Sequence, residues 1–309
     1  MKTERGSSLP RELHRLKRGL SGLHRGIYNA GLAVERFRSR LSLKQVERDG
    51  KPSFYLERPG PGEKLVLIHG FTGSKDNWLM YAQHLPRGLH LIVPDLIGHG
   101  ENAPDMDRDY HGWAFTDALH NLLGELGLER FHLAGHSLGG LLSTGYATRH
   151  PEQVQSLLLV CPAGVHPTEL SDSFRLIEEG RNPFLCDSRS DYDRYVDLLF
   201  HTPAPIPGLA HSFLCRDLVE RKLLFAKMWD DLNAGDEDVT TLLRSVDTPT
   251  RVVWGRHDRV LHPAGMEIFC DNIPSADGAW LECGHCPPVE CPGELAALHL
   301  ELVGHKMRG

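Results

Sequence analysis

Long runs of apolar residues are missing from this 309-residue sequence. No stretch approaches the roughly 18 consecutive apolar residues that a membrane-spanning helix requires, so the body of the protein is expected to be soluble. The seven cysteines are odd in number and scattered, and no secretory signal precedes them. They are expected to be free thiols in a reducing compartment, which predicts a cytoplasmic protein.

A large excess of positive charge is missing as well. The chain carries 34 basic and 41 acidic residues, and this net charge of −7 makes its main body a poor match for nucleic acid. About 40% of the residues are apolar. At this length, that fraction is enough to bury one large α/β core with an inserted subdomain.

The first 45 residues differ from the rest in charge and pattern. Up to Lys51 there are 13 Lys or Arg against 5 Asp or Glu. Residues 1–45 are predicted to form a basic amphipathic helical arm, because apolar residues recur at the steps of three and four that make one helical stripe. The stripe consists of Leu13, Leu16, Leu20, Leu23, Ile27, Ala30, Val34, Phe37 and Leu41.

Several glycines lower the helix propensity of this arm, so it is expected to need a surface to lie on. They are Gly19, Gly22, Gly26 and Gly31. A basic polar face with an apolar stripe suits an anionic membrane surface, which would place the protein peripherally at a membrane. Packing of the stripe on the cap or on another subunit is the alternative, and the sequence leaves the oligomeric state open.

Short apolar runs alternate with helical patterns from Ser53 onward. Such runs suit strands buried on both faces of a parallel sheet. They are Leu65–Ile68, Leu89–Val93, Phe131–Ala134, Leu157–Val160 and Val252–Trp254. Helical patterns cover Lys75–Leu85, Trp113–Leu126, Leu138–Arg149 and Pro263–Cys270. The alternation predicts an α/β fold with a mostly parallel, twisted sheet flanked by helices.

This alternation stops between about Ala163 and Asp247. We interpret residues 163–247 as a helical cap inserted into a core formed by residues 46–162 and 248–309. Substrate-binding residues are expected within this cap segment, although the sequence does not identify them. Its aromatic residues, which form either a greasy acyl pocket or simply the core of the cap, are Phe174, Phe184, Tyr192, Tyr195, Phe200, Phe213, Phe225 and Trp229.

The segment Gly135-His136-Ser137-Leu138-Gly139-Gly140 follows one predicted strand and precedes a helical stretch. This is the context of a G-x-S-x-G nucleophile elbow, in which glycines permit a sharp turn and the serine hydroxyl is exposed at the carboxyl edge of the sheet. An ordinary loop is the alternative for the pentapeptide alone. The flanking strand and helix favour Ser137 as a nucleophile.

A serine nucleophile needs a histidine base and an acid that orients the imidazole, and this fold supplies them in the order Ser, Asp, His. Asp258 follows the strand Val252–Trp254, and His285 follows the short strand-like run Ala279–Glu282. A turn aspartate and an exposed loop histidine are the alternatives. The rival bases, none of which follows the last strand, are His136, His257 and His262.

The oxyanion of a tetrahedral intermediate requires rigid backbone N–H donors. Leu138, directly after the nucleophile, is expected to supply one, and Phe71 in the loop His69–Gly73 the other. That loop lacks the G-x-x-x-x-G-K-[ST] spacing of a phosphate-binding loop. Because the triad and backbone amides suffice for acyl transfer, no metal or organic cofactor is expected.

A second motif, Cys283-Gly284-His285-Cys286, has the spacing of a thioredoxin-like C-x-x-C, and Cys291 lies close enough to suggest a metal cluster. A redox centre would have this motif at the start of a helix after the first strand of a βαβ unit. A structural zinc would have a second ligand pair, which is missing. Neither is expected here.

With these residues in place, the chain resembles the α/β-hydrolase family, and within it the monoacylglycerol-lipase-like branch of small capped lipases and esterases. The resemblance runs from about Lys64 to the C-terminus on the motifs His69-Gly70-Phe71 with Lys75-Asp76-Asn77-Trp78, Pro94-Asp95-Leu96-Ile97-Gly98-His99-Gly100, Gly135–Gly140, Leu159–Gly164, Trp254–Asp258 and Cys283–His285. In that family these six motifs are, in the same order, the oxyanion loop, a structural turn, the nucleophile, the entry to the cap, the acid and the base.

Epoxide hydrolases and haloalkane dehalogenases share this scaffold but carry Asp where this chain has Ser137. The resemblance therefore implies a serine carboxylic-ester hydrolase that acts on acylglycerols or similar apolar esters through an acyl-enzyme. One alternative is a carbon–carbon bond hydrolase that uses the same triad on a β-diketone-like substrate. A ligand receptor that retains a slow hydrolase site is the other.

Overall fold

The computed structural model describes residues 11–48, 50–203, 208–235 and 239–304. For residues 11–21 it describes the backbone alone. The side chains of Leu13, Leu16 and Leu20, which belong to the predicted stripe, therefore lie outside the described residues.

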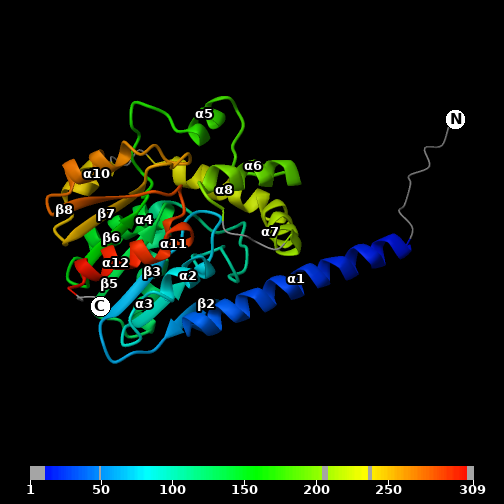
Figure 1. Ribbon diagram of the computed structural model, residues 1–309, viewed down its shortest axis with the longest axis horizontal. Helices are drawn as coiled ribbons and strands as arrows, with labels where there is room; N and C mark the ends of the chain where they lie inside the picture. Colours follow the sequence, from blue (N-terminus) through cyan, green and yellow to red (C-terminus); the bar gives the residue numbers. More distant parts are fainter. Residues whose placement is uncertain (1–10, 49, 204–207, 236–238, 305–309) are drawn as a thin grey trace.

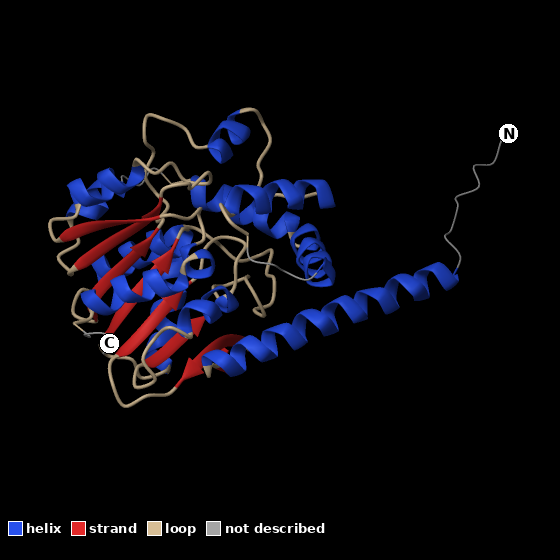
Figure 2. Cartoon of the chain, viewed as in Figure 1, coloured by secondary structure: helices blue, strands red, loops and turns tan. Residues whose placement is uncertain are grey.

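An eight-stranded sheet with the strand order β1-β2-β4-β3-β5-β6-β7-β8 forms the centre of the molecule (Figure 2). The strands β3 to β8 pair in parallel, whereas β1 pairs with β2 and β2 with β4 in antiparallel fashion. Their bounds are Ser42–Arg48 (β1), Lys51–Arg58 (β2), Lys64–Ile68 (β3), His90–Pro94 (β4), Phe131–His136 (β5), Val154–Val160 (β6), Thr250–Gly255 (β7) and Ala276–Leu281 (β8).

Apolar runs explain the central strands. Leu65 to Ile68 and Leu157 to Val160 are fully buried, as expected for strands that are covered by helices on both faces. The predicted α/β fold with a mostly parallel sheet is confirmed. The hairpin β1–β2 was not predicted, because β1 is an edge strand with mostly exposed polar side chains and no apolar run.

Two groups of helices cover the sheet. α2 (Leu79–Ala82), α11 (Pro287–Glu290) and α12 (Pro292–Leu302) contact one another and lie in front of the sheet in Figure 1. The other group contains α3 (Gly112–Glu125), α4 (Leu138–Arg149), α9 (Val239–Arg244) and α10 (Gly265–Asn272). The predicted helix Lys75–Leu85 is shorter and divided, because a 3-10 turn, η1 (Lys75–Trp78), precedes α2.

Between β6 and β7 the chain leaves the sheet, and the described part of residues 163–247 contains helices and no strand. Besides α9, the helices are α5 (Asp172–Glu178), α6 (Arg189–Leu199), α7 (Gly208–Glu220) and α8 (Lys222–Asn233). Figure 2 shows α5 to α8 gathered at one end of the sheet. Four residues of the Pro-rich stretch 203–207 lie outside the described residues.

The N-terminal helix α1 (Arg11–Ser39) runs along the molecule and projects beyond it toward its N-terminal end (Figure 1). It contacts the body through Tyr28, which stacks on Phe213 of α7 with ring centroids 4.5 Å apart, and through Arg36, which donates two 2.8 Å hydrogen bonds to Asp76. Within the described residues, no helix is both long and apolar enough to cross a bilayer.

The predicted apolar stripe is not the face by which α1 contacts the body. Tyr28 and Arg36 lie on another side of the helix, because at about 100° per residue each is roughly 100–180° away from Leu23, Val34 and Phe37. In the stripe, Leu23 is 54%, Val34 49% and Phe37 84% exposed. Only its last member, Leu41, is buried, just after the helix ends. Packing of the stripe on the cap is therefore wrong for Leu23, Val34 and Phe37, whereas Ile27 is half-buried.

Candidate active site

The turn between β5 and α4 carries Ser137 in a strained conformation, with φ 56° and ψ −117°. Glycines allow this turn, because a Cβ at Gly135 would collide with the carbonyl oxygen of Gly139, and one at Gly139 with that of Ile68. Ser137 is half-buried and lines the main cleft of the molecule.

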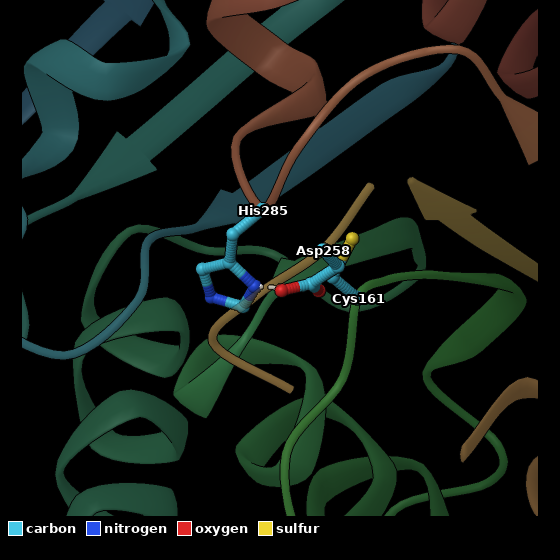
Figure 3. A group of neighbouring side chains, drawn as sticks. All are labelled: Cys161, Asp258 and His285. Atoms are coloured by element: carbon cyan, nitrogen blue, oxygen red, sulfur yellow. Dashed lines mark hydrogen bonds and ion pairs between the residues drawn. The ribbon is translucent and has the colours of Figure 1, made fainter. Parts of the chain in front are cut away.

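Asp258 and His285 come together from the loops after β7 and β8, as Figure 3 shows. His285 Nδ1 lies 2.8 Å from Asp258 Oδ2 in a fully buried pair. Because the carboxylate accepts, the imidazole proton lies on Nδ1, which leaves Nε2 as the basic nitrogen. His285 lines the same cleft as Ser137.

The carboxylate of Asp258 is saturated with donors. Oδ1 accepts from the backbone amides of Val260 at 2.8 Å and Leu261 at 2.9 Å. Oδ2 accepts from Trp254 Nε1 at 3.1 Å in addition to His285. Four N–H groups aimed at one carboxylate fix its orientation.

The rival histidines have other environments. His136 Nε2 donates to the carbonyl oxygen of His285 at 2.7 Å, and burial lowers the pKa of His136 to about 3, so it stays neutral. His257 is exposed and stacks on His201 with ring centroids 3.8 Å apart. His262 faces Glu169 at 3.3 Å. Of these three, only His136 lines the cleft, and its Nε2 is already engaged.

The loop after β3 aims the amide of Phe71. His69 Nε2 accepts from the Leu96 amide at 3.0 Å, so the proton lies on Nδ1, which donates to the carbonyl oxygen of Gly70 at 2.8 Å. Burial lowers the pKa of His69 to about 4 and keeps this tautomer neutral. In a trans peptide the C=O and the next N–H point in opposite directions. Holding the Gly70 carbonyl on one side therefore fixes the Phe71 N–H on the other.

The amide of Leu138 is fixed by the same principle. The carbonyl oxygen of Ser137 accepts from Gly140 at 2.9 Å and from Ala163 at 3.0 Å, so the Leu138 N–H points the opposite way. Within the described part of the chain, nothing accepts a hydrogen bond from the Phe71 or Leu138 amide. Gly70 lies against Ser137, since a Cβ there would be 3.1 Å from the serine Cβ. Two unused N–H groups thus flank the serine.

Cys161, directly after β6, lies beside the carboxylate of Asp258 (Figure 3). Together with His285 these side chains place potential metal-ligand atoms within 4.8 Å of one another. Burial and the nearby carboxylate raise the pKa of the Cys161 thiol, whereas a metal ligand has to be a thiolate. A cation between Asp258 and His285 would also replace their hydrogen bond. The group therefore fits an acid–base pair better than a metal centre.

A cleft of about 2510 Å³ extends from Ser137 and His285 to α1. All eight aromatic residues named in the cap segment line it. Phe71 joins them, with its ring centroid 5.9 Å from Phe184, 5.5 Å from Phe225 and 6.1 Å from Trp229. Pocket and core were opposed alternatives for these aromatics, and several are both, because Phe184 and Phe225 are buried and still face the cleft.

Two groups of supporting residues were missed by the sequence analysis. Arg36 of α1 binds Asp76, and the neighbouring Lys75 is fully buried with its Nζ 2.6 Å from Asp95 Oδ2, so a charged network links α1 to the loop of Phe71. The second group is centred on Glu290 of α11, which contacts the segment after α6. Neither has a local sequence signal, because each connects residues that are distant in the chain.

Glu290 joins the loop of His285 to the segment after α6. Its Oε1 accepts from the Gly284 amide at 2.9 Å, and its Oε2 accepts from the amides of His201 and Thr202 at 2.8 Å each. The His285 amide donates to the carbonyl oxygen of Leu199 at 2.9 Å. His285 is thereby held through its own amide and through that of the preceding Gly284.

Comparisons with known proteins agree with this architecture. Residues 64–184 match the family described as alpha/beta hydrolase fold. The chain is 34% identical over 270 residues to Lipase 1 of Psychrobacter immobilis, covering 86% of this chain and 85% of that protein. It is 30% identical over 261 residues to Monoacylglycerol lipase abhd6-A of Xenopus laevis, covering 79% of this chain and 77% of that protein.

A solved structure, that of a membrane phospholipase A described as a bacterial virulence factor, superposes with a TM-score of 0.88 at 31% identity and covers 94% of this chain and 95% of its own. The fold, the family match and the relatives all indicate the same family. This chain belongs to the α/β-hydrolase family, in its lipase-like group, and is a lipase or esterase that hydrolyses ester substrates.

Proposed function

We propose that Ser137 is the nucleophile of this hydrolase, with His285 as its general base and Asp258 as the acid that orients the base. The observation that carries this proposal is the 2.8 Å hydrogen bond between Asp258 and His285 beside the cleft that Ser137 lines. The amides of Phe71 and Leu138 form the oxyanion hole, since both are directed and unused within the described residues.

The reaction proceeds in two halves. Ser137 Oγ attacks the ester carbonyl carbon while its proton passes to His285 Nε2, and the carbonyl oxygen becomes an oxyanion that accepts hydrogen bonds from the two amides. Collapse of this intermediate expels the alcohol, which takes the proton from His285, and leaves an acyl ester on Ser137. Water then attacks this ester with the same proton transfers and releases the carboxylic acid.

The substrate class follows from the walls of the cleft. Residues 163–247 act as a cap whose aromatic side chains enclose an apolar acyl chain, and relatives that carry the name monoacylglycerol lipase support an acylglycerol-type ester. Apolar surface removed from water contributes about 0.8 kcal/mol per CH₂. A cleft of this volume has room for a long chain.

Lengthening the acyl chain is expected to raise kcat/KM by up to about fourfold per added CH₂ until the cleft is filled, as 0.8 kcal/mol per methylene implies. The measurement is a series of p-nitrophenyl esters from acetate to palmitate, followed by monoacylglycerols of the same chains. A flat series, or one that peaks at acetate, would contradict an apolar acyl site. Faster turnover of a ring-cleavage dienoate would favour carbon–carbon hydrolysis, and binding without multiple turnovers would favour a receptor.

We also propose that α1 places the enzyme peripherally on an anionic membrane surface. In its stripe Phe37 is 84%, Leu23 54% and Val34 49% exposed, while Tyr28 and Arg36 tether another face of the helix to the body. Apolar side chains on an amphipathic helix insert at the boundary of headgroups and acyl chains. Because α1 also lines the cleft, such a surface would present lipid esters near its entrance.

Replacing Phe37 by aspartate is expected to lower the partition coefficient for anionic liposomes by about tenfold or more, because burial of such a side chain contributes roughly 1.5–3 kcal/mol. Co-sedimentation measures it. Asn29→Asp is the matched control, since it adds the same charge to an exposed position of α1 outside the stripe. Equal partitioning of the wild type, both variants and a chain without residues 1–45 would remove the membrane proposal, and turnover of a water-soluble ester is expected to be unchanged by Phe37→Asp.

A further inference from the structure

Two cysteines that the proposed mechanism does not use lie side by side next to the catalytic loop. The thiols of Cys283 and Cys291 share a hydrogen bond at an Sγ–Sγ distance of 3.0 Å. Cys283 lies between β8 and His285, and Cys291 lies between α11 and α12. Both are free thiols, and the partner of Cys283 is therefore not Cys286, which the C-x-x-C spacing had suggested.

Backbone contacts hold the two thiols in this position. Glu290 Oε1 accepts from the Gly284 amide at 2.9 Å, so the residue before Cys291 is tied to the residue after Cys283. The Cys291 amide donates to the carbonyl oxygen of Pro287 at 3.1 Å. A sulfur–sulfur bond is about 2.05 Å long, so its formation requires an approach of only about 1 Å within a loop that is already closed.

We propose that Cys283 and Cys291 form a reversible disulfide that closes the loop carrying His285. Cys291 is partly exposed, whereas Cys283 is buried, so a small disulfide oxidant reaches Cys291 first. The hydrogen bond with Cys291 and burial both raise the pKa of Cys283, which keeps it protonated until its neighbour has reacted.

Oxidised glutathione forms this disulfide by two successive thiol–disulfide exchanges. The Cys291 thiolate attacks one sulfur of glutathione disulfide, and the first glutathione leaves as a thiolate. Cys283 loses its proton, attacks the Cys291 sulfur of the mixed disulfide and releases the second glutathione. One protein disulfide is formed, two cysteine sulfurs are oxidised, and one glutathione disulfide is reduced to two thiols.

The bond is expected to restrain the loop without displacing the base. His285 is held by Asp258 through its side chain and by Leu199 through its amide, and neither contact involves a cysteine side chain. Oxidation is therefore expected to leave ester turnover intact and to raise the melting temperature, since a cross-link reduces the freedom of the unfolded chain. This inference does not depend on the proposed catalytic roles, because it is tested by counting thiols.

The test is equilibration of the full-length protein in glutathione buffers of increasing oxidation, followed by thiol titration after unfolding. The wild type is expected to fall from seven titratable thiols to five. Proteolysis after glutamate cuts the chain between Glu290 and Cys291. The fragment that contains Cys283 and the fragment that contains Cys291 then stay joined only if the disulfide has formed. Cys291→Ser is expected to keep its six remaining thiols, whereas the matched control Cys270→Ser, also partly exposed, is expected to lose two.

Retention of all seven thiols by the wild type across the series would overturn the proposal. Glutathione adducts without an internal bond would overturn it too. Cys286 lies in the same proteolytic fragment as Cys283, so the peptide map does not tell which of the two is bonded to Cys291. The variant Cys286→Ser distinguishes them. It is expected to lose two thiols, whereas retention of all six would assign the bond to Cys286 and contradict the proposal. If Cys291→Ser does not fold, the peptide map of the wild type still decides.

Discussion

Ser137→Ala is expected to lower kcat/KM for the preferred ester by about 10⁵-fold or more, as removal of a triad nucleophile does in serine hydrolases. Alanine fits the turn, because it is smaller than serine and the φ of 56° is strained for either residue. The fold is therefore retained while the attacking oxygen is lost. Ester kinetics at high enzyme concentration measure the residual rate, and thermal unfolding verifies the fold.

Ser143→Ala is the matched control for this variant. Ser143 is fully buried on the same helix, α4, and its hydroxyl has no hydrogen-bond partner within the described residues. Removing that hydroxyl takes away no contact with the cleft, so turnover close to the wild type is expected. If Ser137→Ala kept a tenth of the activity, Ser137 would not be the nucleophile.

Asp258→Asn is expected to lower kcat by about 10⁴-fold, with a smaller change in KM. Both oxygens of Asp258 face N–H donors, from Val260 and Leu261 on one side and from Trp254 and His285 on the other. The NH₂ group of asparagine therefore opposes a donor in either orientation. The imidazole responds by moving its proton to Nε2, where it can no longer accept the serine proton.

The measurement is kcat and KM over a pH series, since a base in the wrong tautomer lowers kcat at every pH rather than displacing the profile. Asp277→Asn is the control, because Asp277 only forms a surface ion pair with Arg251 at 2.6 Å, and such pairs contribute about 0–1 kcal/mol. A loss of less than tenfold in Asp258→Asn would mean that another group orients His285.

Local sequence patterns predicted those strands of this fold that are buried on both faces of the sheet. The runs at β3 and β6 are apolar on both faces, and α4 matches its expected range from Leu138 to Arg149 because it begins at the elbow itself. The hairpin β1–β2 escaped detection, because pairing at a sheet edge depends on a partner strand and leaves no apolar run. The three positions that we propose as the triad were predicted from their order along the chain.

The orientation of α1 shows what periodicity alone does not determine. The stripe that includes Val34 and Phe37 has the strongest apolar pattern, yet other residues contact the body, among them Tyr28 through an aromatic stack and Arg36 through ion pairs with Asp76 and Glu101. Specific contacts of this kind are invisible to a hydrophobic count. The same holds for His69, whose role follows from the direction of one carbonyl group rather than from its motif.

The contacts of Glu290 join the segment after α6 to the loop of His285. A movement of the cap that carried residues 199–202 with it would break the bond between His285 N and Leu199 O and remove His201 and Thr202 from the carboxylate. It would also loosen the hold on His285. Any motion of α6 to α8 that kept His285 in place would therefore have to leave residues 199–202 where they are.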